Sequence, residues 1–149
     1  RARRTDTGRV ARQMRDALNT GDRLVLFAEG TSDIGTHVLP FRTALLGAAR
    51  DAIGDAVPIQ PMTIAYLAVS GLPLSRHERP NIAWVGNMGL GDNLAAILSS
   101  GRKEVVLAFG EPLFEADRKV AARRAEQSVR EMLVALNRGV PLPSTPQPV

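Results

Sequence analysis

The sequence predicts an α/β fold in which a mostly parallel central sheet is flanked by helices. The prediction follows from the order of two patterns. Apolar runs rich in β-forming residues alternate along the chain with stretches of helical periodicity. The sequence shows no internal repeat and no second domain. The 149 residues are 44% hydrophobic and 23% charged, which is the composition of a folded domain. We expect one domain over residues 1–137 and a flexible, proline-rich tail over residues 138–149.

Four helices are predicted, the first following a cap at residues 5–7 and the last capped by Asp117. Pro40 suits the first turn of the second helix, because the N–H group that proline lacks has no partner there. The predicted helices span residues 8–19, 40–53, 93–99 and 117–137. The predicted strands span residues 23–27, 63–67, 81–86 and 104–110. The first strand is nearly all apolar, which predicts a central strand covered on both faces.

Polar residues follow the first predicted strand directly, over residues 29–32. In open α/β sheets, ligands bind at the carboxyl ends of the strands, so these residues are candidates for a binding site. Gly30 allows a ligand to approach the backbone closely, and the hydroxyl groups of Thr31 and Ser32 can donate or accept hydrogen bonds. Glu29 can only accept when it is ionised. A polar turn before a helix explains an isolated Glu-Gly-Thr triplet equally well, so the rest of the chain must decide.

Positive charge is concentrated at the start of the chain. The net charge is +4, and residues 1–15 contain six arginines against one acidic residue. Such a cluster indicates an anionic partner, which could be a phosphate, an acidic membrane surface or a nucleic acid. Arg1, Arg3 and Arg4 precede the first helix and are candidate ligand contacts. Three later arginines are expected on a solvated helix face: Arg9, Arg12 and Arg15.

The composition excludes several classes of site. The chain has no cysteine, so disulfides, thiolate metal ligands and a cysteine nucleophile are excluded. His37 and His77 have no partner at a metal-ligand spacing, and we expect no metal and no cofactor. Aromatic residues make up only 4% of the chain, which disfavours nucleic-acid binding through stacked bases. The longest apolar runs fall far short of the ~20 residues that a membrane-spanning helix requires.

Three stretches together resemble the motifs of the lysophospholipid acyltransferase family. Residues 27–32 are similar to the family's Phe-Pro-Glu-Gly-Thr-Arg-Ser motif, with Ala28 in place of the proline and Ser32 in place of the arginine. Residues 39–42 are similar to its Pro-Phe-Lys segment. Residues 57–61 resemble its Val-Pro-x-x-Pro stretch. Phe27 and Pro61 are the motif residues that support the match at the two ends.

The resemblance implies an acyltransferase-like α/β domain over residues 1–137, with the fold of glycerolphosphate acyltransferases. It implies acyl transfer from acyl-CoA or acyl carrier protein to the hydroxyl of a lysolipid. The acceptor would be 1-acyl-glycerol-3-phosphate or lyso-ornithine lipid, and the residues do not separate the two. By the same resemblance, the site would lie at the cytoplasmic face of a membrane, with interfacial contact through the basic end. The implied acceptor-binding residues are Arg1, Arg3, Arg4, Glu29, Gly30, Thr31 and Ser32.

One departure from the family pattern is large. The family's catalytic base lies in a His-x4-Asp motif, but the fifth residue after His37 is Arg42 and the fifth after His77 is Ile82. We expect the motif upstream of Arg1, with the domain incomplete at its N-terminus and this fragment inactive alone. Two alternatives remain at this point. One is a non-catalytic module that binds anionic lipids, and the other is nucleic-acid binding through the arginine cluster, which the few aromatic residues disfavour.

Overall fold

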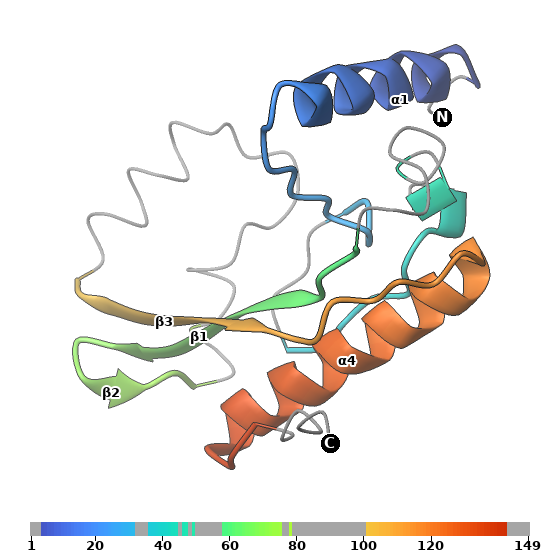
Figure 1. Ribbon diagram of the computed structural model, residues 1–149. Helices are drawn as coiled ribbons and strands as arrows, with labels where there is room; N and C mark the ends of the chain where they lie inside the picture. Colours follow the sequence, from blue (N-terminus) through green and yellow to red (C-terminus); the bar gives the residue numbers. More distant parts are fainter. Residues whose placement is uncertain are drawn as a thin grey trace.

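The protein was analysed as a computed structural model, which describes residues 4–31, 36–44, 46–47, 49, 58–75, 78 and 101–142. These residues form an α/β arrangement of three strands and two longer helices (Figure 1). The elements are α1 (Arg4–Asn19), β1 (Met62–Val69), β2 (Leu72–Pro73), β3 (Lys103–Phe109) and α4 (Arg118–Arg138). Residues 43–44, 46–47 and 49 are also helical, which fits the predicted second helix. The strand predicted at 81–86 and the helix predicted at 93–99 lie outside the described residues.

The described sheet has the strand order β2-β1-β3, and both pairs of neighbours are antiparallel. The prediction of a mostly parallel sheet is therefore not confirmed. Ser70 and Gly71, with φ angles of 51° and 82°, form a two-residue turn between β1 and β2. A turn of that length can connect only antiparallel strands, because parallel strands need a long crossover connection. The strands predicted at 63–67 and 104–110 are confirmed as β1 and β3.

The strand predicted at residues 23–27 is wrong. In the part of the chain that the structure describes, these residues belong to no strand and pair with none. Val25 and Phe27 are 65% and 70% exposed, whereas a central strand would bury them. The segment has the β-forming composition of a strand, but composition alone supplies no hydrogen-bonding neighbour.

Helix α4 covers one face of the sheet and forms the main core with it (Figure 1). Ala65 of β1 and Ala108 of β3 point toward this helix, and both are almost fully buried. Side chains on the opposite face of β3 are open, with Leu107 and Phe109 55% and 59% exposed. The buried residues of this core are Val38, Ala65, Ala108, Val129, Met132 and Leu133.

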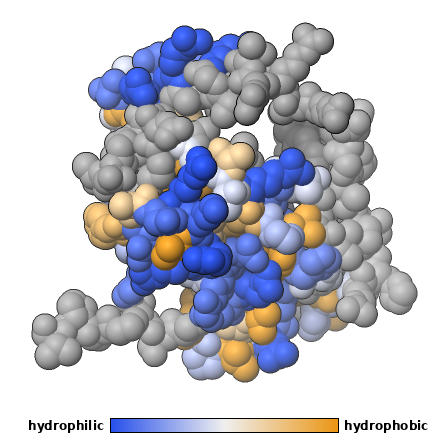
Figure 2. Space-filling model, turned by 90° about the vertical axis from the view of Figure 1, so that its right-hand side faces the viewer, coloured by the Kyte–Doolittle hydropathy of each residue, from blue (hydrophilic) through white to orange (hydrophobic). Residues whose placement is uncertain are grey.

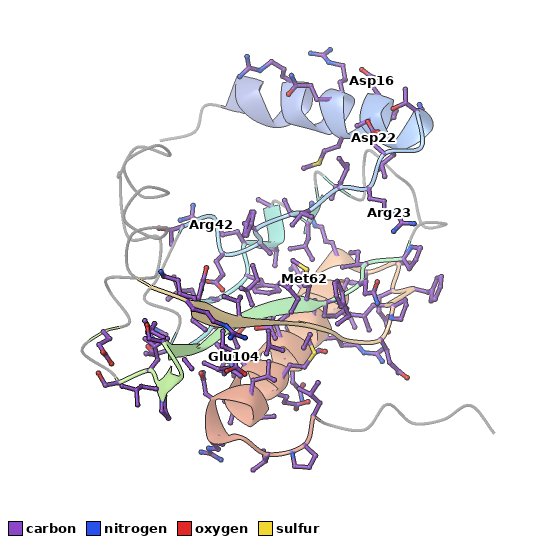
Figure 3. All side chains as sticks on the ribbon, turned by 90° about the vertical axis from the view of Figure 1, so that its left-hand side faces the viewer. Asp16, Asp22, Arg23, Arg42, Met62 and Glu104 are labelled. Atoms are coloured by element: carbon purple, nitrogen blue, oxygen red, sulfur yellow. The ribbon has the colours of Figure 1, made fainter. Side chains whose placement is uncertain are left out.

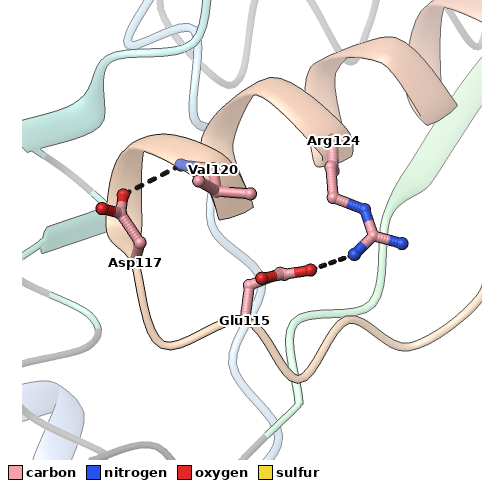
Figure 4. Close-up of polar contacts among 4 residues, drawn as sticks. All are labelled: Glu115, Asp117, Val120 and Arg124. Carbon is pink, nitrogen blue, oxygen red and sulfur yellow. Dashed lines mark hydrogen bonds and ion pairs between the residues drawn. The ribbon is translucent and has the colours of Figure 1, made fainter.

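Helix α4 begins and ends close to its predicted limits. Asp117 caps its start, since its Oδ1 atom accepts from the backbone N–H group of Lys119 at 2.7 Å and from that of Val120 at 3.0 Å. Figure 4 shows the bond to Val120. An ion pair between Glu115 and Arg124 lies beside this cap. Gly139 ends the helix in the left-handed conformation, with a φ angle of 65°. The proposed tail boundary at residue 138 stays a prediction, and residues 143–149 lie outside the described part.

Helix α1 lies apart from α4, at the opposite end of the molecule in the two ribbon views (Figures 1 and 3). It begins at Arg4, a few residues before the predicted start. Met14, Ala17 and Leu18 are half-buried. Its arginine-bearing face is exposed, as predicted, and appears as a hydrophilic band along the top of the molecule (Figure 2). The exposed arginines are Arg9, Arg12 and Arg15.

The cap of α4 makes stability depend on pH. The N–H group of Val120, followed by that of Lys119, lowers the pKa of Asp117. A carboxylate with a lowered folded-state pKa stabilises the fold above its unfolded pKa of about 3.9, and this effect is lost as the pH falls through the folded-state pKa. Asp117→Ala should lower the melting temperature by a few degrees at pH 7 and by less at pH 2, measured by circular dichroism. Asp117→Asn is the control, because it keeps the cap but not the titration. An equal loss at both pH values for Asp117→Ala would contradict the assignment.

Candidate functional site

Residues 27–30 form a tight turn that presents the predicted site residues. The N–H group of Gly30 donates to the carbonyl of Phe27 at 3.1 Å, and Gly30 has a φ angle of 66°. Glycine adopts this left-handed conformation without the strain that a side chain would cause. Gly30 and Thr31 are exposed, while Glu29 is half-buried. The turn therefore offers its polar groups at the surface.

Arg42 holds this turn through two hydrogen bonds. Its backbone N–H group donates to the carbonyl of Ala28 at 2.8 Å, and its side-chain Nε donates to the carbonyl of Glu29 at 3.1 Å. A Cβ atom at Gly30 would lie only 2.8 Å from Arg42 Nε and 2.9 Å from its Cδ. The arginine side chain thus lies directly against the glycine, and this contact requires the absence of a side chain at residue 30.

Helix α4 anchors the segment that carries Arg42. The backbone N–H group of Phe41 donates to Glu126 Oε2 at 3.0 Å, and Glu126 also pairs with Arg130 at 2.6 Å, one helical turn along. A hydrogen bond to a charged acceptor is stronger than one between neutral groups. Glu126 therefore connects α4 to the turn, through Phe41 and its neighbour Arg42.

Apolar packing joins the same pieces. Ala28, Leu46 and Ala122 are buried together, so the turn, the helical segment after it and α4 share one small cluster. Phe41 and Ile59 pack against this cluster. Because Ala28, Phe41 and Ile59 belong to residues 27–32, 39–42 and 57–61, all three of the stretches singled out in the sequence meet here.

The two residues that mark the ends of the resemblance differ in burial. Pro61 is buried, and its carbonyl accepts from the N–H group of Gly110 at 2.8 Å. Its missing N–H group costs no hydrogen bond, because Pro61 lies just before β1 rather than inside it. Phe27 is 70% exposed and takes no part in the buried cluster.

The structure places Glu29 and Gly30 in the turn, and Thr31 directly follows it. Ser32, Arg1 and Arg3 lie outside the described residues. Arg4 is the first residue of α1, and its side chain is not among those described. Where these three arginines lie relative to the turn therefore stays a prediction.

Sequence reasoning missed the parts played by Arg42 and Glu126. Arg42 lay within a recognised stretch, so its position close after the turn was a usable signal. Glu126 gave no local signal, since it is 85 positions away from Phe41 along the chain. In Figure 3, Arg42 lies at a level between the sheet and α1.

Among the described residues, no group of three or more metal-ligating side chains is close enough to hold a metal ion. No helix in the same part of the chain has the length and apolar character needed to cross a membrane.

Comparisons with known proteins point to one family. The acyltransferase family model matches residues 1–65, which include the turn and Arg42. The chain is 43% identical to the lyso-ornithine lipid O-acyltransferase of Brucella abortus over 96% of its length and 56% of the relative. It is 36% identical to the enzyme of that name from Rhizobium meliloti, over 93% of the chain and 50% of the relative. The chain is 34% identical to the protein of the same name from Rhodobacter capsulatus, over 78% of the chain and 42% of the relative.

The chain thus spans about half the length of the curated relatives it matches. No solved structure significantly matches the chain.

Gly30→Ala tests the contact between the glycine and Arg42. The new Cβ atom should displace Arg42 from the carbonyl of Glu29, which NMR would detect as a shift of the Arg42 Nε–H signal. Gly21→Ala is the matched control, since Gly21 also has a positive φ angle but has open space around it. Both variants should lose about 1 kcal/mol of unfolding free energy through backbone strain. An Arg42 signal that is unchanged in Gly30→Ala would refute the close contact.

Glu126→Ala tests the anchor on α4. Removing this acceptor leaves the N–H group of Phe41 without its charged partner, which should lower the unfolding free energy by about 1–2 kcal/mol in urea titrations. It should also speed hydrogen exchange at the Phe41 amide. Glu131→Ala is the control, because Glu131 is exposed and accepts a hydrogen bond from Gln127 on the same helix. Equal effects of the two substitutions would mean that Glu126 does not anchor the segment.

Proposed function

The chain belongs to the acyltransferase family, and from this premise we propose that the complete protein acylates a lysolipid. The acyl group would move from the thioester of acyl-CoA or acyl carrier protein to the hydroxyl of the acceptor. The observation that supports the proposal most directly is the turn at residues 27–30 with Arg42 against it. This arrangement lies within the segment that matches the family model.

Lyso-ornithine lipid is the acceptor that we favour over 1-acyl-glycerol-3-phosphate. The proteins from Brucella abortus and Rhizobium meliloti both bear the name of lyso-ornithine lipid O-acyltransferases. Those names do not favour the alternative of a non-catalytic module that binds anionic lipids.

In the proposed reaction, a base takes the proton of the acceptor hydroxyl as its oxygen attacks the thioester carbonyl. The thiol then leaves with a proton, and an ester remains. A positioned general base typically accelerates such a step by ~10²–10⁴-fold. Neither His37 nor His77 begins a His-x4-Asp motif. We therefore assign the base to a segment of the complete protein that corresponds to the part of the relatives not covered by this chain.

Residues of this chain, at the turn and at its start, would bind and orient the acceptor. Thr31 would offer its hydroxyl, and the backbone at Gly30 would allow the headgroup to approach closely. Glu29, which is half-buried in the turn, would hold the turn or an acceptor hydroxyl. Arg1, with Arg3 or Arg4, would attract the anionic group.

We further propose that the protein works at the cytoplasmic face of a membrane. The arginines of α1 that are exposed would attract anionic lipid headgroups, at about 1 kcal/mol for each charge near the surface.

The test is an acyl-transfer assay of the complete protein with both acceptors and labelled acyl thioester. We expect turnover with lyso-ornithine lipid and less with 1-acyl-glycerol-3-phosphate. Glu29→Ala should lose most of this activity while its circular dichroism spectrum is unchanged. Glu104→Ala, which removes an exposed carboxylate on β3, is the control and should keep full activity. Absence of transfer to either acceptor would reject the proposed function, and near-normal turnover of Glu29→Ala would reject the role of that residue.

A further inference from the structure

The side chain of Arg42 is positioned at the turn and keeps most of its hydrogen-bonding capacity. Its Nε atom is bonded to the carbonyl of Glu29 at 3.1 Å, and its Cδ and Nε atoms lie against Gly30. A guanidinium has five N–H donors, and Nε supplies one of them. In the described part of the chain, no hydrogen bond is found from the terminal nitrogens of Arg42, and no carboxylate pairs with it. The residue is exposed.

This arrangement fixes the direction from which a ligand can pair with Arg42. Because Nε is already bonded to Glu29, the two terminal nitrogens form the available edge of the planar group. Such an edge matches the two oxygens of a carboxylate, or two oxygens of a phosphate, in a bidentate pair. The guanidinium carries a positive charge and has no acceptor atoms, so the available edge suits an anion.

Arg42 reaches the turn from the segment that follows it in the chain. Glu126 and the backbone bond to Ala28 hold that segment in place. Little side-chain freedom would therefore be lost when Arg42 pairs with an anion.

We propose that Arg42 binds the oxyanion of the acceptor headgroup and that this oxyanion is the carboxylate of an ornithine unit. This inference rests on the proposed function. When the α-amino group of ornithine is acylated, its carboxylate and its side-chain ammonium remain charged. Of these two groups, only the carboxylate pairs with a guanidinium. Arg42 would then select an acceptor by its carboxylate, beside the turn that holds Glu29 and Gly30.

The experiment compares lyso-ornithine lipid with its methyl ester, which lacks the negative charge. Using the complete protein, kcat and KM are measured for the wild type, Arg42→Ala, Arg42→Lys and the control Arg102→Ala. Arg102 is an exposed arginine directly before β3 that is not part of the turn. Arg42→Ala should reduce kcat/KM for the free acid by about ten- to hundredfold and leave the ester within about twofold.

Arg42→Lys should lose several-fold on the acid, because an ammonium keeps the charge without the two-pronged geometry. Arg102→Ala should match the wild type with both lipids. If Arg42→Ala does not fold, the test rests on the wild type and Arg42→Lys. The ratio of kcat/KM for the acid to that for the ester should then be lower in Arg42→Lys than in the wild type. An equal fall for acid and ester would overturn the proposal, as it would show that Arg42 only holds the turn. No fall for either lipid would also overturn it.

Two further measurements distinguish a failure of this inference from a failure of the proposed function. If Arg42→Ala loses turnover of 1-acyl-glycerol-3-phosphate but not of lyso-ornithine lipid, the bound oxyanion is a phosphate and the carboxylate assignment is wrong. If the wild type transfers no acyl group, the proposed function fails, and calorimetric binding of the acid and ester forms tests Arg42 alone. Weaker binding of the acid only in the Arg42 variants would support the inference, whereas equal binding by all four proteins would contradict it.

Discussion

The short segment at residues 38–42 is the constraint on which the candidate site depends. Val38 is buried in the core between the sheet and α4, and Phe41 is bonded to Glu126 on that helix. Arg42 then reaches back to the carbonyls of Ala28 and Glu29. A surface turn would ordinarily sample many conformations, and ordering each of its residues costs about 1–2 kcal/mol. Here the cost is met by contacts that connect the turn to the best-packed part of the protein.

Charge is arranged unevenly along this connection. Glu126 lies between the N–H group of Phe41 and the guanidinium of Arg130, so its charge is compensated on α4. Arg42 has a neutral carbonyl as its partner in the described structure. The positive charge at the turn is consequently available to an anion, while the negative charge behind it serves the fold. This separation of roles makes the turn suited to binding rather than only to connecting two elements.

Prediction from sequence succeeded where local signals act over a few residues. The long last helix was predicted from its apolar periodicity and from Asp117, and α4 has that cap and nearly those limits. The strands β1 and β3 followed from β-branched and apolar runs. The same signal misled at residues 23–27, because a run such as Leu24 to Phe27 states which residues suit a strand but not whether a neighbour will pair with them. The parallel direction of the sheet was inferred from alternation alone, but β1 pairs with both β2 and β3 in the antiparallel direction.

The sequence by itself determined the family, the turn residues Glu29 to Thr31 and the chemistry that those groups can perform. These properties depend on the identity and order of neighbouring residues, which a single chain displays directly. Only the tertiary structure decided that Arg42 lies against Gly30 and that Glu126 supports it. Arg42 is close to the turn in the sequence, but Glu126 is 85 positions from Phe41, and folding brings this second pair together through the packing of α4 on the sheet. No local pattern encodes such a meeting, because its geometry is set by the whole core.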